Sequence, residues 1–534
     1  MSGLFDNKND GKGRRQERSQ QSETTQRKQR RLTIIVVSVL IIALIGALVI
    51  NSSFIRRSAT AVTIGGRAFS AAEFDYFYNS SIYEHSHLVN SQMPPEFASM
   101  MLPVRGQLLT SQIQNPDTGE TWADFFRQRT EESLAQFVQL YNAANAAGFV
   151  MSEENLIAME EAINALMEEG DWAVFEGQFP TPMAYLRALF GSSLNEAVLR
   201  DVHEFIFTAF SFNNYMRESF TYTQAQMDAF YEENRDNFDI FRYRMLLITP
   251  EVLNPMDFTT GDELYDAQIA AQEDAAMLAQ VLVSTITSEE EFIEVARTFD
   301  EERYEDPRST MFDVQGINLN FNFAAWLLDD SRAYGDVTTV ETEDGTHLLF
   351  FMERNDNNYR LASMRQILIR PEPVLSEDFP EFGEDHPGVI AETERAEREA
   401  SERAAAALAA FEATDRTEAA LIELMYVHSD DTTPGGLYED IAMFPYETVT
   451  GRRLMRIVPE LEEWLFDQSR QVGDFELIHT EFGYHLIFFT GHGENFRNFI
   501  AEDNMRVNDH EQWIEALPEV GAHRHWGFML TSPN

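Results

Sequence analysis

The chain is 534 residues long, more than one hydrophobic core usually organises, so we expect three or four domains. With 44% hydrophobic and 12% aromatic residues it has the apolar side chains to build cores, which excludes a wholly disordered chain. Its formal net charge of -49 excludes the basic footprint that nucleic-acid binding needs, so we expect no nucleic-acid partner.

The charge is unevenly distributed along the chain. The first 31 residues hold nine basic and four acidic side chains, a net charge of +5, which leaves -54 for the remainder. No lysine follows this tail. The acid excess favours solubility in a cation-rich environment. The chain also contains no cysteine, which excludes disulfides, thiolate metal sites and a cysteine nucleophile.

Residues 32–50 (LTIIVVSVLIIALIGALVI) form an uncharged apolar run of nineteen residues, long enough to span a bilayer as a helix. A cleavable signal peptide is the alternative, but its apolar region is normally shorter and ends at a cleavage site with small residues. We therefore predict an uncleaved anchor at 32–51, with the basic tail 1–31 in the cytoplasm and the bulk of the chain outside. Arg56 and Arg57 place positive charge on the far side as well.

Between residues 60 and 238 the pattern predicts a hairpin followed by helices. Gly65-Gly66 is typical of a two-residue turn between short strands, and Ser70 is a helix N-cap signal. Apolar side chains then recur at helical spacing in four blocks, which are 122–147, 152–167, 194–220 and 223–234. We expect a mainly helical region at 60–238, whose aromatic side chains are mostly core.

The C-terminal half contains an internal repeat. Residues 326–351 (WLLDDSRAYGDVTTVETEDGTHLLFF) match 464–489 (WLFDQSRQVGDFELIHTEFGYHLIFF) at a constant spacing of 138 residues, and about half of the positions are identical. Upstream, 243–248 pairs with 364–369. Strands and helices alternate in each copy, which predicts an α+β fold with a small antiparallel sheet per copy. The predicted boundaries are 239–358 and 359–493 for the copies and 494–534 for a C-terminal extension.

The second copy carries an insertion. Residues 370–387 are rich in proline and acidic side chains, and the Glu, Ala and Arg pattern of 391–411 predicts a helix of weak apolar character. We interpret this helix as a solvated spacer.

The second copy resembles the parvulin-type peptidyl-prolyl isomerases. The motifs that carry the resemblance occur in the family's order and are Gln366-Ile367-Leu368-Ile369, Ser429-Asp430-Asp431, Gly435-Gly436-Leu437-Tyr438-Glu439, Val458-Pro459-Glu460-Leu461 and Phe482-Gly483-Tyr484-His485. The first copy keeps only the Gly345-Thr346-His347 strand and the helix before it, so it looks like a degenerate parvulin-like domain.

The region before the repeat resembles the helical chaperone region of envelope foldases. The likeness is carried by VTIGGRAFSAAEFDYFY (62–78), PTPMAYLRALFG (180–191) and TQAQMDAFYEEN (223–234). Phe- and Met-rich helical surfaces of this kind can repack around varied apolar clients.

Together the two resemblances imply a membrane-anchored, extracytoplasmic foldase that isomerises X-Pro bonds and chaperones exported proteins. Its partners would be unfolded or newly exported polypeptides. No cofactor is expected, because the isomerisation breaks no covalent bond. The alternative is a non-catalytic chaperone or scaffold that uses the parvulin fold only for binding.

Three catalytic candidates follow from the motif positions. Asp431 matches the family's Cys or Asp that faces the twisting carbonyl, and His485 matches its last-strand histidine. Gln366 stands where the family usually has a second histidine, and Met245 occupies that position in the first copy. Because glutamine cannot titrate, Gln366 favours the non-catalytic alternative. The substrate-binding candidates implied by position are Ile457, Leu461, Phe482, Phe444 and Ser429.

Two weaker patterns complete the search. Ser429, Asp431 and His485 have the composition of a hydrolase triad, but the sequence has no Gly-x-Ser-x-Gly elbow. His510, His523 and His525 could contribute to a metal site, but no fixed ligand set accompanies them, so we expect no metal. The C-terminal segment is instead interpreted as a solvated tail with Trp526 packed against the rest.

Overall fold

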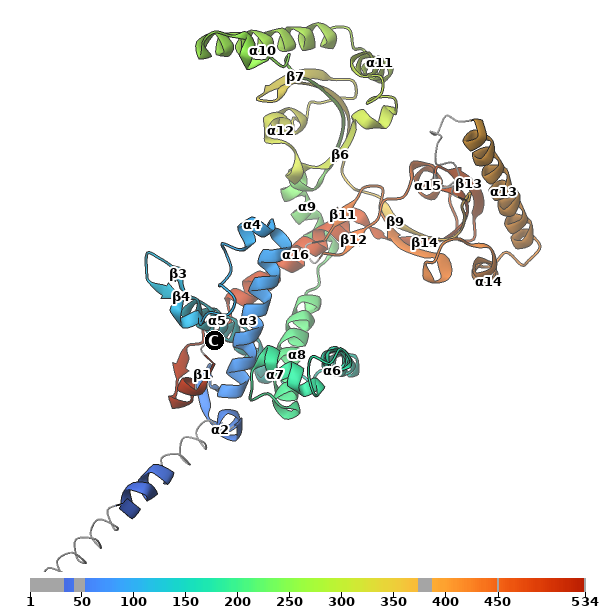
Figure 1. The fold of residues 1–534 in the computed structure, drawn as a ribbon. Helices are drawn as coiled ribbons and strands as arrows, with labels where there is room; N and C mark the ends of the chain where they lie inside the picture. Colours follow the sequence, from blue (N-terminus) through green and yellow to red (C-terminus); the bar gives the residue numbers. More distant parts are fainter. Residues whose placement is uncertain (1–32, 43–52, 373–386, 449–450, 533–534) are drawn as a thin grey trace, which may run out of the picture. The chain divides into compact units, whose positions relative to one another are not determined.

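Residues 33–42, 53–372, 387–448 and 451–532 are described by a computed structural model (Figure 1). Contacts divide the chain into two compact units, Met1–Ser219 with His510–Asn534, and Phe220–Asp509. Of the predicted anchor, residues 33–42 form a helix, and the other positions lie outside the described residues. No helix among the described residues is both long enough and apolar enough to cross a membrane.

The first unit contains the predicted hairpin. Strands β1 (Thr60–Ile64) and β2 (Arg67–Ser70) pair around the turn at Gly65 and Gly66. Ser70 then caps α3 (Ala71–Gln92): its hydroxyl accepts from the backbone N–H of Glu73, whose carboxylate accepts from the N–H of Ser70. The remaining elements of this unit are α2 (Ser53–Ser58), α4 (Pro95–Ala98), η1 (Leu109–Ser111), β3 (Ile113–Asn115), β4 (Glu120–Thr121), α5 (Trp122–Ala147), α6 (Glu153–Phe175), α7 (Pro182–Phe190), α8 (Glu196–Ser219), β15 (Ala522–Arg524) and η6 (Trp526–Leu530).

The core of the first unit is rich in aromatic side chains, as predicted. Its fully buried rings come from the hairpin and from α3, α5 and α8, and they include Phe69, Phe74, Tyr78, Phe126 and Phe205. The end of α6 differs, because Trp172 and Phe175 are 64% and 84% exposed. The helices therefore close one core while leaving apolar surface at one end of α6.

The interpretation of the C-terminal segment as a solvated tail is wrong. Strand β15 pairs with β1, and the backbone N–H of Ser532 donates to the buried Asp75 carboxylate at 2.6 Å. Trp526 is 59% exposed, whereas Trp513 packs against Phe212. A three-residue strand that adds to an existing edge has no periodicity of its own to reveal it.

The second unit contains two four-stranded antiparallel sheets of the same design, which confirms the predicted small sheets. One has the order β6-β5-β8-β7 and the other β10-β9-β14-β13. The last two strands pair in equivalent registers, Val340 opposite His347 and Ile478 opposite His485. Both copies of the repeat therefore fold into one topology.

The bounds of the elements follow the repeat. The first sheet and its helices comprise β5 (Ile240–Ile248), η2 (Pro255–Asp257), α10 (Gly261–Val283), α11 (Glu289–Phe299), η3 (Pro307–Thr310), β6 (Met311–Gln315), η4 (Gly316–Asn318), α12 (Phe321–Leu327), β7 (Val337–Thr342) and β8 (Gly345–Asn355). The second set comprises β9 (Arg360–Ile369), α13 (Pro387–Glu412), α14 (Glu418–His428), η5 (Pro434–Gly436), β10 (Leu437–Ile441), β11 (Tyr446–Glu447), β12 (Arg453–Leu454), α15 (Pro459–Leu465), β13 (Phe475–Thr480) and β14 (Gly483–Asn495). Helix α9 (Gln224–Phe238) precedes both sets, and α16 (Phe496–Glu515) follows them.

The glycine that opens the last strand recurs because the strand approaches its neighbour closely there. Gly483 has a φ of 120°, and a Cβ atom on it would lie 2.4 Å from the carbonyl oxygen of Ile369. Gly345 holds the equivalent place in the first sheet, where a Cβ atom on it would lie 2.4 Å from the carbonyl oxygen of Ile248. Any larger residue would push the last strand off the first.

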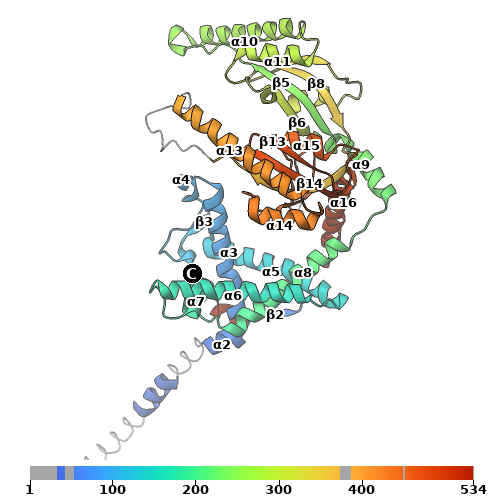
Figure 2. The same cartoon turned by 90° about the vertical axis from the view of Figure 1, so that its right-hand side faces the viewer.

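Helix α13 is not a solvated spacer, so that interpretation is also wrong. It lies across the second sheet (Figure 2) and contacts it through a stripe of small side chains with one large one at its end. The stripe consists of Ala396, Ala400, Ala404, Ala407 and Phe411. They pack at helical spacing against side chains of β9 and β14, which include Ile367, Ile369, Leu486 and Phe488. Alanine contributes little to an apolar pattern, which is why the sequence concealed this face.

The stripe predicts a position-specific effect of enlarging an alanine. Ala404 is fully buried, so Ala404→Leu should overpack the interface and destabilise it by about 1–3 kcal/mol. Ala405 faces solvent, so Ala405→Leu should change stability by less than about 0.5 kcal/mol. Hydrogen exchange of the β9 and β14 amides measures both effects locally. Equal exchange in the two variants would contradict the packing described here.

Candidate active site

The loop after α14 is fastened to the first strand of the second sheet by its own side chains. The Ser429 hydroxyl accepts from the backbone N–H groups of Leu368 and Asp431, both at 3.1 Å. The N–H of Asp430 donates to the carbonyl of Leu368, and its carboxylate accepts from the N–H of Arg370 at 2.8 Å. Ser429, a predicted substrate-binding residue, thus holds the loop in place and fixes where Asp431 points.

A continuous chain of hydrogen bonds joins the three predicted catalytic residues. Nε2 of Gln366 on β9 donates to Oδ2 of Asp431 at 2.8 Å, and Oε1 of Gln366 lies 2.9 Å from Nδ1 of His485 on β14. With Oε1 as acceptor, His485 carries its proton on Nδ1. Its Nε2 then accepts from the Thr480 hydroxyl at 2.8 Å. Glutamine links the histidine to the carboxylate without itself carrying a charge.

The site holds one fixed negative charge next to a neutral histidine. Burial raises the pKa of Asp431, but hydrogen bonds from the Thr433 backbone, Gln366 and Tyr438 outweigh it and leave the pKa below its ordinary value. Burial, reinforced by Arg370, lowers the pKa of His485 to about 4. At neutral pH, therefore, Asp431 is ionised and His485 is uncharged.

Three further residues belong to this network that the sequence did not single out as site residues, although Tyr438 lies within one of the parvulin-like motifs. The Tyr438 hydroxyl donates to Oδ2 of Asp431 at 2.8 Å and lies 3.0 Å from the Thr433 hydroxyl. The backbone N–H of Thr433 donates to Oδ1 of Asp431 at 2.9 Å. For Thr480 a signal existed, because its counterpart Thr342 recurs at the repeat spacing of 138. Tyr438 and Thr433 have no such counterpart.

Beside the network lies an apolar cluster that contains two of the predicted pocket residues. Leu461 is buried in it, and Ile457 packs against it half-buried. Tyr438 belongs to the same cluster, so one residue contacts the apolar side and also donates to the carboxylate. The structure thus places Ile457 and Leu461 close to the site of Asp431, through Tyr438.

The two predicted phenylalanines lie elsewhere. Phe482 is 52% exposed in the turn between β13 and β14, and its backbone N–H donates to the Thr480 hydroxyl at 3.1 Å. Phe444 is buried under the guanidinium of Arg242, at 5.3 Å from the ring centre. Phe482 is thus joined to the network through its backbone, whereas Phe444 packs against Arg242.

The first copy keeps the histidine without the network. Met245 on β5 occupies the place of Gln366, since it pairs with Leu349 as Gln366 pairs with Ile487. Nδ1 of His347 is buried and has no hydrogen-bond partner among the described residues. Burial lowers the pKa of His347, which keeps the ring neutral. A thioether cannot replace the glutamine oxygen as a strong acceptor.

The structure also shows where the residues of the two weaker patterns lie, namely the hydrolase-like set and the C-terminal histidines. The Ser429 hydroxyl accepts two backbone N–H groups, and both nitrogens of His485 are engaged by Gln366 and Thr480, so the arrangement is not that of a hydrolase triad. Of the C-terminal histidines, His510 contacts Asn213 and His525 contacts Thr63, each at 2.9 Å. Among the described residues no group of three or more His, Asp or Glu side chains could hold a metal ion.

Comparison with known proteins finds matches among solved structures. No family model and no curated protein matches the chain. Among solved structures, the peptidylprolyl isomerase PrsA from Bacillus anthracis is 8% identical with a TM-score of 0.19, the match covering 56% of this chain and 94% of that one. PrsA from Bacillus subtilis is 11% identical with a TM-score of 0.16, covering 59% of this chain and 90% of that one.

The network predicts that Tyr438 holds the Asp431 carboxylate in its ionised form. Tyr438→Phe removes one donor while burial persists, so the pKa of Asp431 should rise. Carboxyl NMR titration of the full-length chain, with the Asp431 signal assigned through Asp431→Asn, measures the change. Tyr426→Phe is the matched control, since Tyr426 is 74% exposed. An unchanged titration in Tyr438→Phe would show that this hydroxyl does not stabilise the charge.

Proposed function

We propose that the chain is a foldase and that its second parvulin-like copy catalyses the cis–trans isomerisation of X-Pro bonds. The observation that carries the proposal is the hydrogen-bonded chain from Thr480 through His485 and Gln366 to Asp431, next to the apolar cluster around Leu461. It rests also on the parvulin motifs, whose positions converge there. The first copy, which lacks the chain, is proposed to be inactive.

Catalysis of amide rotation requires a negative charge near the amide oxygen and a site that excludes water. The planar amide is held by resonance that places partial negative charge on its oxygen, with a barrier to rotation of about 18–20 kcal/mol. Twisting returns electron density to nitrogen and reduces the charge on oxygen. A fixed carboxylate facing that oxygen therefore disfavours the planar form more than the twisted one. Asp431, ionised and held by three donors, supplies such a charge.

The apolar cluster offers a place for the proline ring. Ile457 and the ring of Tyr438 are half-buried, so part of each remains open to a ligand. A ring packed on them would lie beside the hydroxyl that donates to Asp431. Leu461 is buried beneath and supports this surface. The predicted role of Phe482 in binding substrate stays a prediction, and its exposure leaves the ring free to do so.

The location is part of the proposal. The apolar run 32–50 after a basic tail supports a single membrane anchor with the foldase outside the cytoplasm. Within that run, the described side chains of 34–37 and 39–42 are 46–68% exposed, so the part of the chain that the structure describes leaves them largely uncovered. The partners would be newly exported, unfolded polypeptides, and no cofactor is needed.

The alternative is a non-catalytic chaperone or scaffold, which Gln366 favours because the family usually has a histidine there. The alternative and the enzyme predict different outcomes for the same variants. A scaffold would suppress aggregation, as measured by light scattering, without accelerating isomerisation.

Removing the carboxylate should abolish most of the catalysis. In a protease-coupled assay on a proline tetrapeptide, the full-length chain should accelerate isomerisation, and Asp431→Ala should lower kcat/KM by about tenfold or more, a cost of about 1.4 kcal/mol or more. Glu439→Ala is the matched control, since Glu439 is exposed on β10 and outside the network. Rates at background for the folded wild-type chain would establish the scaffold alternative.

The isomerisation rate should not depend on pH near neutrality, the range in which a pair of histidines would titrate. The pKa of His485 is about 4 and that of Asp431 lies below its ordinary value, so neither group changes charge near neutrality. The rate should stay constant above about pH 6 and fall as the pH drops through about 4, when His485 gains a proton and Nε2 stops accepting from Thr480. Gln366→His should raise the rate and add a titration that the wild type lacks. A step near pH 6.5 in the wild type would rule out a neutral network.

A further inference from the structure

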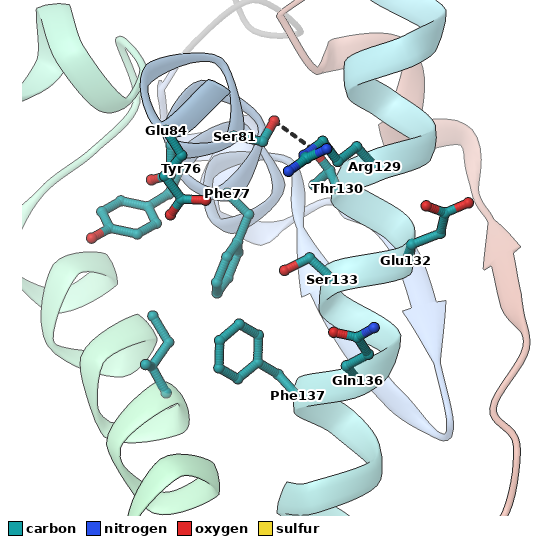
Figure 3. A pocket seen from close by; sticks show the side chains of 12 residues that line it. Tyr76, Phe77, Ser81, Glu84, Arg129, Thr130, Glu132, Ser133, Gln136 and Phe137 are labelled. Carbon is teal, nitrogen blue, oxygen red and sulfur yellow. Dashed lines mark hydrogen bonds between the residues drawn. The ribbon is translucent and has the colours of Figure 1, made fainter. Parts of the chain in front are cut away.

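A cavity of about 450 Å³ lies inside the first unit, between α3, α5 and α8 (Figure 3). This volume falls within the roughly 300–1,000 Å³ that ligand sites usually occupy. The cavity is far along the chain from the network at Asp431 and shares no residue with it. Its lining has an apolar side and a polar side.

The apolar side is built from rings that the core holds in place. Phe77 on α3 and Phe137 on α5 point toward each other (Figure 3), and both contact the buried ring of Phe205 with centres 6.2 Å apart. Tyr76 stacks on Phe190 at 4.8 Å, and Ile206 of α8 adds an aliphatic surface. The aromatic floor therefore exists before any ligand arrives, which limits the entropy cost of binding.

The polar side carries neutral groups with unused hydrogen-bonding capacity. The hydroxyls of Ser81 and Thr130 lie 3.3 Å apart where α3 meets α5, and each donates to a carbonyl of its own helix. Ser80, Ser133 and Gln136 make no side-chain hydrogen bond to any other described residue. Hydroxyl and amide groups both donate and accept, which matches the alternating N–H and C=O groups of an extended peptide.

The charges at the rim favour a cationic neighbour over an anion. Glu84 and Glu132 outnumber Arg129, so the lining has a net charge of -1. Within the described chain, Glu84 and Arg129 belong to no ion pair, and both side chains are exposed. The surrounding protein is strongly acidic as well. Phosphates and other anionic ligands are therefore disfavoured, and a basic side chain near the rim is stabilised.

We propose that this cavity binds an extended segment of unfolded polypeptide that carries an aromatic or large aliphatic side chain next to a lysine or arginine. The apolar side chain packs between Phe77 and Phe137, the backbone bonds to Ser133 and Gln136, and the basic side chain lies beside Glu84. The inference rests on the proposed foldase function and names its client class at a site separate from the isomerase domain.

The test uses the full-length chain and a short fluorescein-labelled peptide with one phenylalanine between two lysines. Fluorescence anisotropy should show saturable binding. Ser133→Trp fills the cavity and should weaken binding by about tenfold or more. Ser91→Trp is the matched control, since Ser91 is exposed on α3 outside the cavity, and it should bind like the wild type. Because tryptophan at Ser133 could disturb the core, Glu84→Gln serves as a second, milder variant.

The same binding titrations test both the preference for a basic flanking residue and the location of the binding site. Glu84→Gln should weaken the lysine-flanked peptide several-fold and leave a glycine-flanked peptide unchanged. Equal binding by Ser133→Trp and the wild type would overturn the site, and equal binding of a glutamate-flanked peptide would overturn the charge preference. Tetrapeptide isomerisation is measured in parallel. Isomerisation without peptide binding would sink this inference alone, and peptide binding lost in Ser133→Trp without isomerisation would sink only the proposed enzyme.

Discussion

The side-chain amide of Gln366 is the interaction on which the candidate site depends. It donates to Asp431 with one end and accepts from His485 with the other, so it links two groups that do not contact each other directly. Strand pairing sets this geometry, because β9 and β14 run antiparallel with Gln366 opposite Ile487 and His485 opposite Leu368. A donor and an acceptor on one neutral group fix the histidine tautomer and hold the carboxylate, with no charge of its own to desolvate.

A neutral link suits a reaction in which no proton is transferred. Amide rotation makes and breaks no bond to hydrogen, so a titratable histidine at position 366 is not required by the chemistry itself. What the reaction needs is a charge that does not move. Under the proposed function Asp431 would supply this charge, since three donors hold it, namely the side chains of Gln366 and Tyr438 and the backbone N–H of Thr433. In the proposed reaction, an amide and a tyrosine would give this support in place of a second histidine.

The features that depend on neighbouring residues in the sequence were predicted, and those that depend on tertiary packing were missed. Gln366, Asp431 and His485 were found because short motifs in the order of the parvulin family carry them, and the helix start at Ser70 because capping is local. The alanine face of α13 and the docking of Ser532 on Asp75 were missed, since small side chains and single bonds leave no periodic signal. The cavity beside Phe77 was beyond reach as well, because three separate helices form it.

Comparing the two copies shows which features the sheet needs in order to fold and which belong to the candidate site. Both sheets have one topology and both keep a histidine on the last strand, yet only the second surrounds it with partners. In the first copy the orphaned Nδ1 of His347 costs about 1–3 kcal/mol, and the sheet forms nonetheless. The network is therefore not a by-product of folding this sheet. Its hydrogen bonds spare His485 this cost and also hold the Asp431 carboxylate in place, which the proposed function requires.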